Sequence, residues 1–171
     1  MQDRIDEQAP PPVPIEHSVH LRLGDDEIDI LLSLSRSIFP NFQDDYLLGR
    51  LALLQEPVLH LAERGGELAG FKFGYRRDQT TLYSWLGGVQ PAARRSGVAQ
   101  ALMARQHAWA AEAGYRFIDT RARAANNAMI MLNLRHGFHV VGFEIDERGL
   151  PMVLQRKSLA ASAAGPSRIT P

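Results

Sequence analysis

The sequence of 171 residues contains no cysteine. This absence excludes disulfide bonds, thiolate metal sites and a cysteine nucleophile. The chain also has no net charge, because 19 Lys and Arg residues balance 19 Asp and Glu residues, whereas general nucleic-acid binding requires a basic field. No run approaches the ~18 consecutive apolar residues of a membrane span. We therefore expect neither nucleic acid nor a membrane as a partner.

The two ends of the sequence differ in composition from the middle. The N-terminal stretch "MQDRIDEQAPPPVPIEH" is acidic and proline-rich, has no apolar segment of the signal-peptide kind, and its prolines cannot donate to a helix or sheet. The tail "AASAAGPSRITP" is small and polar, as disordered segments are. We predict a flexible arm over residues 1–17, one domain over 18–159, a disordered tail over 160–171 and, by default, a cytoplasmic location.

Apolar periodicity and turn residues predict alternating strands and helices in the middle of the chain. The predicted order is strand, two helices, three strands, helix, strand, helix and two strands. The predicted helices cover 25–40, 41–55, 96–114 and 126–138, with Asn41 as the cap of the second. This order indicates a mixed α/β (α+β) domain around one central sheet.

The stretch "VQPAARRSGVAQALM", residues 89–103, places two arginines and a glycine where a predicted helix begins. A helix N-terminus is already partly positive and its first N–H groups have no intrahelical partner. Arg94 and Arg95 add charge, Ser96 adds a hydroxyl, and Gly97 lets a ligand approach the backbone closely. The combination suits an external anion such as a pyrophosphate, although a solvated loop is the alternative. The nucleotide-binding pattern Gly-x-x-x-x-Gly-Lys-Ser/Thr is absent.

Two motifs carry a resemblance to a known family. Arg94, Gly97 and Ala99 fit the pattern Arg/Gln-x-x-Gly-x-Gly/Ala, and "NNAMIMLNLRHGF" is similar to the pattern Asn-x-x-Ala-x-x-Leu-Tyr-x-x-x-Gly-Phe. With both motifs in this order, the chain resembles the GNAT family of acyl-CoA-dependent N-acyltransferases over most of residues 18–159. The resemblance implies a mixed central sheet of about seven strands flanked by four helices, with two parallel strands that splay at the CoA site.

The resemblance also implies acetyl-CoA, or another short acyl-CoA, as co-substrate, with no metal. Carried over position by position, the pantetheine arm would contact Leu86, Gly87, Gly88 and Val89. The pyrophosphate would contact Arg94, Arg95, Ser96, Gly97, Val98 and Ala99. Asn126 and Asn133 would contact the cofactor arm.

The chain departs from the family at both customary acid and base positions. The family often uses a glutamate on the strand before the loop as base, but "TLYSWLGGV" has no carboxylate. The family's tyrosine acid falls at Asn133. We take Ser84, which is able to order a water, and Asn133 as the catalytic candidates; an inert strand serine and a solvent-facing helix residue are the alternatives. Asp119 is expected to pair with an arginine, and His107 to face solvent.

Acceptor recognition is expected from the connection between the first two helices and from the last hairpin. Phe39, Tyr46 and Trp85 are the candidate substrate contacts, with packing as the alternative role. Together these features predict an acetyl-CoA-dependent N-acetyltransferase that acts on a primary amine of a small molecule or peptide by direct transfer in a ternary complex. The rival interpretation is a non-catalytic acyl-CoA sensor or interaction module. Homodimers are common in the family, so a homodimer is an open alternative to a monomer.

Overall fold

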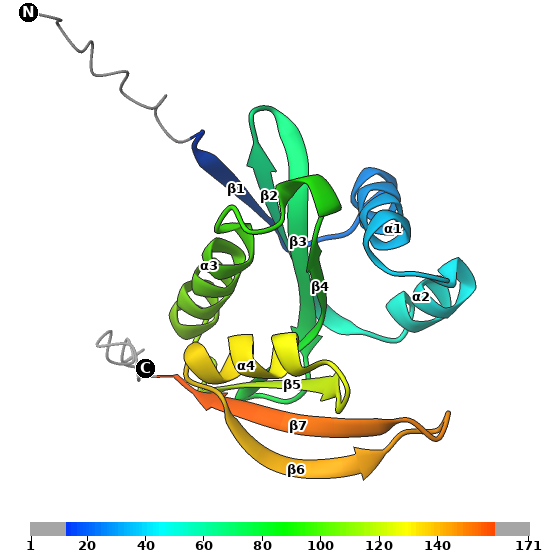
Figure 1. Cartoon of the computed structure of the whole chain (residues 1–171), viewed down its shortest axis with the longest axis vertical. Helices are drawn as coiled ribbons and strands as arrows, with labels where there is room; N and C mark the ends of the chain where they lie inside the picture. The colour runs from blue at the N-terminus through cyan, green and yellow to red at the C-terminus, as the bar shows by residue number, and fades with distance from the viewer. Residues whose placement is uncertain (1–12, 160–171) are drawn as a thin grey trace, which may run out of the picture.

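The computed structural model describes residues 13–159 and contains one seven-stranded sheet in the order β1-β2-β3-β4-β5-β7-β6 (Figure 1). Neighbouring strands are antiparallel, except that β4 and β5 are parallel. Seven strands and four α-helices in the described part confirm the predicted fold class. The strands are β1 (Ile15–His20), β2 (Gln55–Arg64), β3 (Glu67–Arg76), β4 (Thr81–Val89), β5 (Phe117–Arg123), β6 (His139–Ile145) and β7 (Pro151–Ser158). The helices are α1 (Asp25–Ile38), α2 (Asp44–Leu51), η1 (Pro91–Ala93), α3 (Val98–Glu112) and α4 (Asn127–Arg135).

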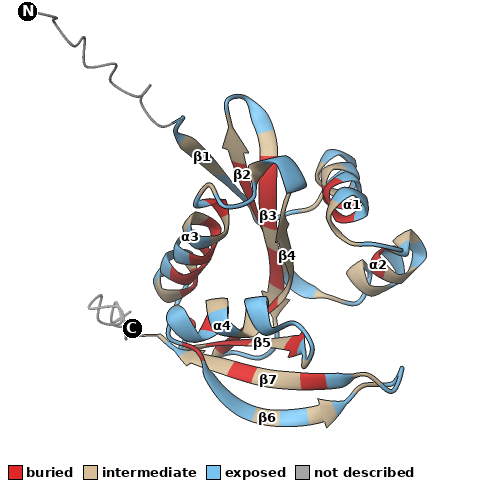
Figure 2. Ribbon diagram, viewed as in Figure 1, coloured by how far each residue is buried: buried red, intermediate tan, exposed pale blue. Residues whose placement is uncertain are grey.

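Helices cover both faces of the first four strands, with α1 and α2 on one side and α3 on the other (Figure 1). Alternation along β3 explains the arrangement, because Phe71 and Phe73 point into the core beneath α1 and α2. On the opposite face, Val98 and Leu102 of α3 pack on small side chains of β2 and β3. The buried residues therefore follow β3 and the inner side of α3 (Figure 2). No helix in the described range is long and apolar enough to cross a membrane.

Several element boundaries differ from the sequence prediction, most clearly at β1 and α2. Strand β1 begins at Ile15, three residues before the predicted start of the domain, because Ile15 already pairs with Arg64 of β2. Helix α2 begins after Gln43, not after Asn41, whose φ of 56° is left-handed; Asn41 as a cap was therefore wrong. Residues 1–12 and 160–171, to which most of the predicted arm and tail belong, lie outside the described residues.

The parallel strands β4 and β5 pair over three residues only, from Thr81 opposite Phe117 to Tyr83 opposite Asp119. The last link between them is the Thr120 hydroxyl, which donates to the Ser84 carbonyl at 2.9 Å. Beyond it, β4 continues to Val89 while β5 pairs with β7 alone. The backbone groups that β4 directs toward β5 from Leu86 onward therefore have no strand partner. The predicted splay is present.

A β-bulge coincides with the divergence. Phe73 is opposite Leu86 and Gly74 is opposite Ser84, so Trp85 is the extra residue of β4. A bulge bends a strand and redirects a side chain. The ring centroids of Trp85 and Phe73 are 5.9 Å apart, on the α1–α2 side of the sheet.

Candidate active site

The loop between β4 and α3 presents a row of free backbone donors. Within residues 13–159, none of the N–H groups from Arg95 to Gln100 has a backbone acceptor. Helix α3 has no acidic residue in its first turn and no side-chain cap. Gly97 precedes it with a φ of 86°, and Arg95 has a φ of 59°. This left-handed geometry turns the loop so that its donors meet at the helix N-terminus, where an anion is favoured.

The side chains of the loop divide into two kinds. Arg94 and Arg95 are exposed, and their charges are therefore available to a ligand. The Ser96 hydroxyl donates to the Ala93 carbonyl at 2.6 Å, which holds the turn. Val98 is buried in the core beneath α3. The predicted pyrophosphate contacts at Ser96, Val98 and Ala99 are therefore available through their backbone N–H groups.

A narrow cavity continues from this loop along the open part of β4. It is bordered by β3, β4, α3 and α4. The lining residues are Phe71, Lys72, Gly87, Gly88, Val89, Ala99, Leu102, Met103, Met129 and Leu132. Gly87 leaves room in this cavity, since a Cβ there would lie 3.1 Å from Cγ of Lys72. Gly88 leaves room for α1 on the opposite face, where a Cβ would lie 2.5 Å from Cγ2 of Ile38. Of the four residues predicted to contact pantetheine, Gly87, Gly88 and Val89 line this cavity. Leu86 instead packs with the core beneath α1 and α2, and its contact with pantetheine stays a prediction.

The two asparagines of the second motif have defined partners. Asn126 caps α4, and its Oδ1 accepts from the Met129 N–H at 3.2 Å. Asn133 is 2 % exposed, and its Nδ2 donates to Oε1 of Gln155 on β7 at 2.8 Å. A solvent-facing Asn133, the alternative interpretation, is therefore wrong. Its contact with a ligand stays a prediction.

Ser84 lies on the side of β4 that faces α3. It is opposite Gly74, where a Cβ would lie 3.5 Å from Nε2 of Gln106 on α3. Ser84 is buried and lines neither the narrow cavity nor the pocket around Trp85. Its role as the residue that orders a water stays a prediction.

A second pocket, of about 460 Å³, lies beside the same divergence of β4 and β5. Tyr75, Tyr83 and Trp85 contribute aromatic surface, and the last hairpin contributes Glu144 and Glu147. Tyr46 of α2 packs against Trp85 with ring centroids 6.1 Å apart. The β6–β7 turn approaches α2 from below (Figure 1), and the guanidinium of Arg148 lies 5.6 Å from the Tyr46 ring. The volume is in the range of small-ligand pockets.

Most acidic groups of this second pocket are already engaged. Asp119 accepts from Arg77 at 2.9 Å and from Arg156 at 2.6 Å, which confirms that it pairs with arginine. Glu144 accepts from Arg121 at 2.8 Å. Asp146 accepts from backbone N–H groups of its own turn. Burial raises the pKa of Tyr83 to about 12, so its hydroxyl stays protonated and able to donate at neutral pH.

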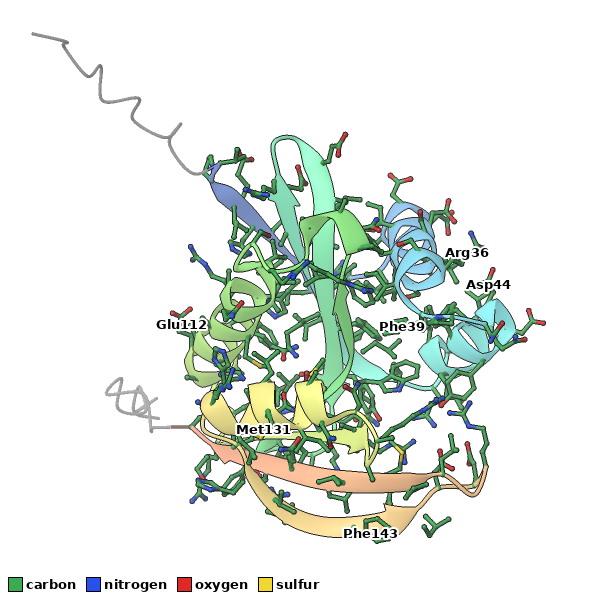
Figure 3. All side chains as sticks on the ribbon, in the orientation of Figure 1. Arg36, Phe39, Asp44, Glu112, Met131 and Phe143 are labelled. Carbon is green, nitrogen blue, oxygen red and sulfur yellow. The ribbon has the colours of Figure 1, made fainter. Side chains whose placement is uncertain are left out.

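The three predicted substrate residues do not lie together. Tyr46 and Trp85 are neighbours at the second pocket. Phe39 instead packs edge-on against Phe71, with ring centroids 6.3 Å apart, and points toward the sheet (Figure 3). It follows α1, which is held to α2 by an ion pair between Arg36 and Asp44. Phe39 is thus part of the wall between the helices and the sheet, separate from the pocket at Trp85.

The structure also reveals polar residues that the sequence analysis misjudged or missed. His107 is 9 % exposed and packs on Phe138 of the α4–β6 connection, so the expectation that it faces solvent was wrong. Lys72 lines the narrow cavity. One signal was present in the sequence: in "ELAGFKFGYR" a lysine alternates with two phenylalanines, which places it on the other face of a buried strand.

Several of these features match parts of an acyl-CoA. The free N–H groups and two arginines match a pyrophosphate, and the unpaired backbone edge of β4 matches the amides of pantetheine. The largely apolar cavity lies where the arm between them would pass, and its volume of about 30 Å³ would have to widen to admit that arm. Among residues 13–159, no group of three or more His, Asp and Glu side chains is placed to hold a metal ion.

Comparison with known proteins agrees with this geometry. Residues 41–126, half of the chain, match the acetyltransferase (GNAT) domain. Ard1 from Thermoplasma volcanium superposes with a TM-score of 0.69 at 16% identity, over 84% of this chain and 98% of that one. The ribosomal-protein-S18-alanine N-acetyltransferase from Escherichia coli gives 0.71 at 15% identity, over 91% of this chain and all (100%) of that one.

A GNAT family acetyltransferase from Elizabethkingia anophelis with acetyl-CoA bound is also similar, with a TM-score of 0.67 at 18% identity, over 85% of this chain and 98% of that one. No curated protein matches the sequence. The fold and site define an acyltransferase of the acyl-CoA-binding class. The chain belongs to the GNAT acetyltransferase family.

Proposed function

We propose that the protein is an acetyl-CoA-dependent N-acetyltransferase that transfers an acetyl group to a primary amine of a small molecule or peptide. One observation carries the proposal. The divergence of β4 and β5 borders both the narrow cavity with its anion loop and the aromatic pocket at Trp85. Two substrates therefore have separate places that meet at the same strands, as direct transfer in a ternary complex requires.

Each part of the site then has a task. The N–H groups from Arg95 to Gln100 and the charges of Arg94 and Arg95 hold the pyrophosphate. The edge of β4 from Leu86 to Val89 orients the pantetheine arm, and the apolar cavity keeps water away from it. Acetyl-CoA supplies the activated acyl group when bound. Trp85 and Tyr83 form the wall against which the amine is placed.

The acceptor pocket fits a compact amine or the end of a peptide. Its carboxylates are largely engaged by arginines, so attraction of a cation would rest on Glu147 and on the exposed part of Glu144. One protein of similar fold is an N-acetyltransferase of a ribosomal-protein alanine. Peptide N-termini therefore belong in the set of acceptors to be tested.

A non-catalytic acyl-CoA sensor is the second candidate. The observation in its favour is Asn133, which replaces the family's tyrosine and is buried in a hydrogen bond with Gln155. An amide does not supply the proton that a departing thiolate accepts. Strand β4 also has no carboxylate to act as base.

A thiol-release assay separates the two candidates. Purified protein and acetyl-CoA are screened against amino acids, polyamines, other small amines and N-terminal peptides, while acetyl-CoA binding is measured by calorimetry. Release that depends on one acceptor class supports the enzyme and identifies its substrate. Tight binding without release on any acceptor supports the sensor. In an active enzyme, Ser84→Ala should lower turnover and spare CoA affinity if Ser84 orders a water. Asn133→Ala should lower turnover and also weaken CoA binding if Asn133 contacts the cofactor arm.

The apolar edge of the sheet favours a homodimer. Strand β6 is the last strand of the sheet, and Val140, Val141, Phe143 and Ile145 are 56 to 62% exposed (Figure 2). Phe143 points outward from it (Figure 3). An open edge with apolar side chains pairs readily with another strand, and a second copy presents the same surface about a two-fold axis. Light scattering should give the mass of a dimer, and Phe143→Lys should give a monomer; a monomeric wild type contradicts the assembly.

A further inference from the structure

The narrow cavity beside β4 contains one charged side chain. Lys72 lies on β3 between Phe71 and Phe73, which are both buried beneath α1 and α2. Alternation along the strand therefore directs Lys72 to the other face, toward α3. Of the ten residues that line the cavity, the other nine are apolar or glycine. Strand β3 therefore places one ammonium group, that of Lys72, in the cavity assigned to the pantetheine arm.

The stem of Lys72 lies over β4. Lys72 and Gly87 are opposite each other in the β3–β4 ladder. A Cβ at Gly87 would lie 3.1 Å from Cγ of Lys72. The missing side chain at Gly87 therefore makes room for the lysine, whose stem runs from β3 toward the strand that borders the gap. The absence of a side chain at Gly87 leaves space for the Lys72 stem as well as for a ligand.

The charge of Lys72 is unmatched within the described residues. It forms no ion pair there. The titratable groups that interact with it are themselves basic. They are His60 on β2, His107 on α3 and His136 after α4. Lys157 on β7 also lowers the pKa of His107 and His136. Lys72 is only partly exposed, and a cation that is largely removed from water without a partner is costly, so this environment favours a ligand that brings negative charge.

The group that develops negative charge in such a passage is the sulfur of CoA. Resting on the proposed function, we infer that the Lys72 ammonium is the proton donor to the departing sulfur and occupies the role left open by Asn133. The acceptor amine attacks the thioester carbonyl and the carbon–sulfur bond breaks. Lys72 Nζ gives one proton to the sulfur, and the new amide nitrogen loses its extra proton to water. Neutral Lys72 then regains a proton from solvent.

The acidity of the two groups is suited to this exchange. Burial lowers the pKa of Lys72 to about 8, whereas a free thiol has a pKa of about 8.5. A donor matched to its acceptor transfers its proton with little free-energy change and is still largely charged at neutral pH.

A titration of bound CoA tests the inference without turnover. The thiolate absorbance of CoA bound to the full-length protein is followed against pH, with desulfo-CoA as the blank. The wild-type protein should ionise the thiol at a pH below that of free CoA, shifted toward the pKa of Lys72 at about 8. Lys72→Met, which keeps most of the apolar stem, should raise the pH at which the bound thiol ionises to that of free CoA or above. Lys157→Met, the chain's other lysine and not part of the cavity, should leave it unchanged.

Kinetics with an active acceptor separate proton donation from charge alone. Lys72→Met should lower kcat about 10²-fold with little change in the affinity for CoA. Lys72→Arg should restore the low thiol ionisation but not kcat at neutral pH, because arginine does not release its proton.

Three results would overturn the inference. Equal thiol ionisation in wild type and Lys72→Met removes Lys72 from the site while leaving the proposed function intact. An acetyl group found on Lys72 by mass spectrometry shows that the amine accepts the acyl group and does not serve as the acid. Failure of the wild-type protein to bind CoA at all rejects the proposed function, and this inference with it.

Discussion

Arg95 combines two properties that rarely occur together, a left-handed backbone and an exposed charge. Its φ is 59°, a conformation that costs a non-glycine residue roughly 1 kcal/mol or more. The turn is held by the Ser96 hydroxyl and by the 3₁₀ segment η1 before it. The strained backbone at Arg95 therefore helps to align the free N–H groups at the N-terminus of α3.

Reversing the charge of Arg95 should weaken CoA binding. We expect Arg95→Glu to raise the dissociation constant for CoA about tenfold or more, because a carboxylate would face the pyrophosphate. A tenfold change corresponds to a loss of ~1.4 kcal/mol of binding free energy. Asn tolerates the left-handed backbone, so Arg95→Asn should lose less affinity and keep the fold. Calorimetry on both variants measures the difference. Equal affinity of Arg95→Glu and wild type would remove the pyrophosphate from this loop.

The loop was predictable because its signal is local. Arg94, Gly97 and the helix that follows are adjacent in the sequence, and a helix N-terminus has the same chemistry in any fold. Lys72 and His107 were not predictable in the same way. Whether each lies inside depends on which face of its element is covered, and that is decided by partners distant in the sequence. His107 is buried by Phe138, some thirty positions away.

At the scale of elements, close contact between β3 and β4 depends on glycine. A Cβ at Gly70 would lie 2.7 Å from the Gly88 carbonyl oxygen, which is backbone and cannot rotate away. We expect Gly70→Ala to lower the free energy of unfolding by about 1–3 kcal/mol. The shift of β4 needed to relieve the contact should also weaken CoA binding.

Gly49 provides a matched control for this substitution. It lies inside α2, is exposed, and a Cβ there would meet nothing within 4 Å. Gly49→Ala should therefore raise the free energy of unfolding by about 0.5–1 kcal/mol. Urea denaturation of both variants gives the comparison. A Gly70→Ala protein as stable as wild type would show that β3 and β4 are less tightly apposed than described.

The sequence predicts the elements better than their irregularities. Turn residues and periodicity place the β2–β3 hairpin at Gly65 and Gly66, whose φ values of 63° and 79° suit a tight two-residue turn. The bulge at Trp85 has no such signal, because a bulge is a property of two strands in register. The splay of β4 from β5 was expected only through the family resemblance, since parallel strands separated by a helix leave no local trace of where their pairing ends.

At the scale of the whole molecule, buried histidines connect stability to pH. Burial, together with a smaller effect of nearby basic groups that include Lys72, lowers the pKa of His60 to about 4 and that of His107 to about 3. His60 has both ring nitrogens without a hydrogen-bond partner in the described part of the chain. Both rings are therefore neutral in the folded protein throughout the weakly acidic range, whereas an unfolded histidine takes up a proton near pH 6.5.

The sign of the effect follows from proton uptake. Between about pH 6.5 and pH 4 the unfolded chain binds protons that the folded chain does not, so the free energy of unfolding falls as the pH falls. Full protonation of one unfolded histidine gives a slope of about 1.4 kcal/mol per pH unit. Urea denaturation from pH 7.5 down to about pH 4.5 covers the upper and larger part of this range and stays above most carboxylate titration.

His60→Leu removes one of these protons and should reduce the slope by up to about 1.4 kcal/mol per pH unit; His17 and His136, whose pKa values are also lowered by burial, add to the slope in both proteins. His139→Leu changes an exposed histidine and serves as the control, with the slope expected to stay the same. Because Lys72 is among the groups that lower the pKa of both His60 and His107, Lys72→Met should also flatten the slope by letting the histidines charge more readily. A slope that is equal in wild type and His60→Leu would mean that His60 takes up its proton as readily in the folded protein as in the unfolded chain. Burial and Lys72 would then lower its pKa less than described.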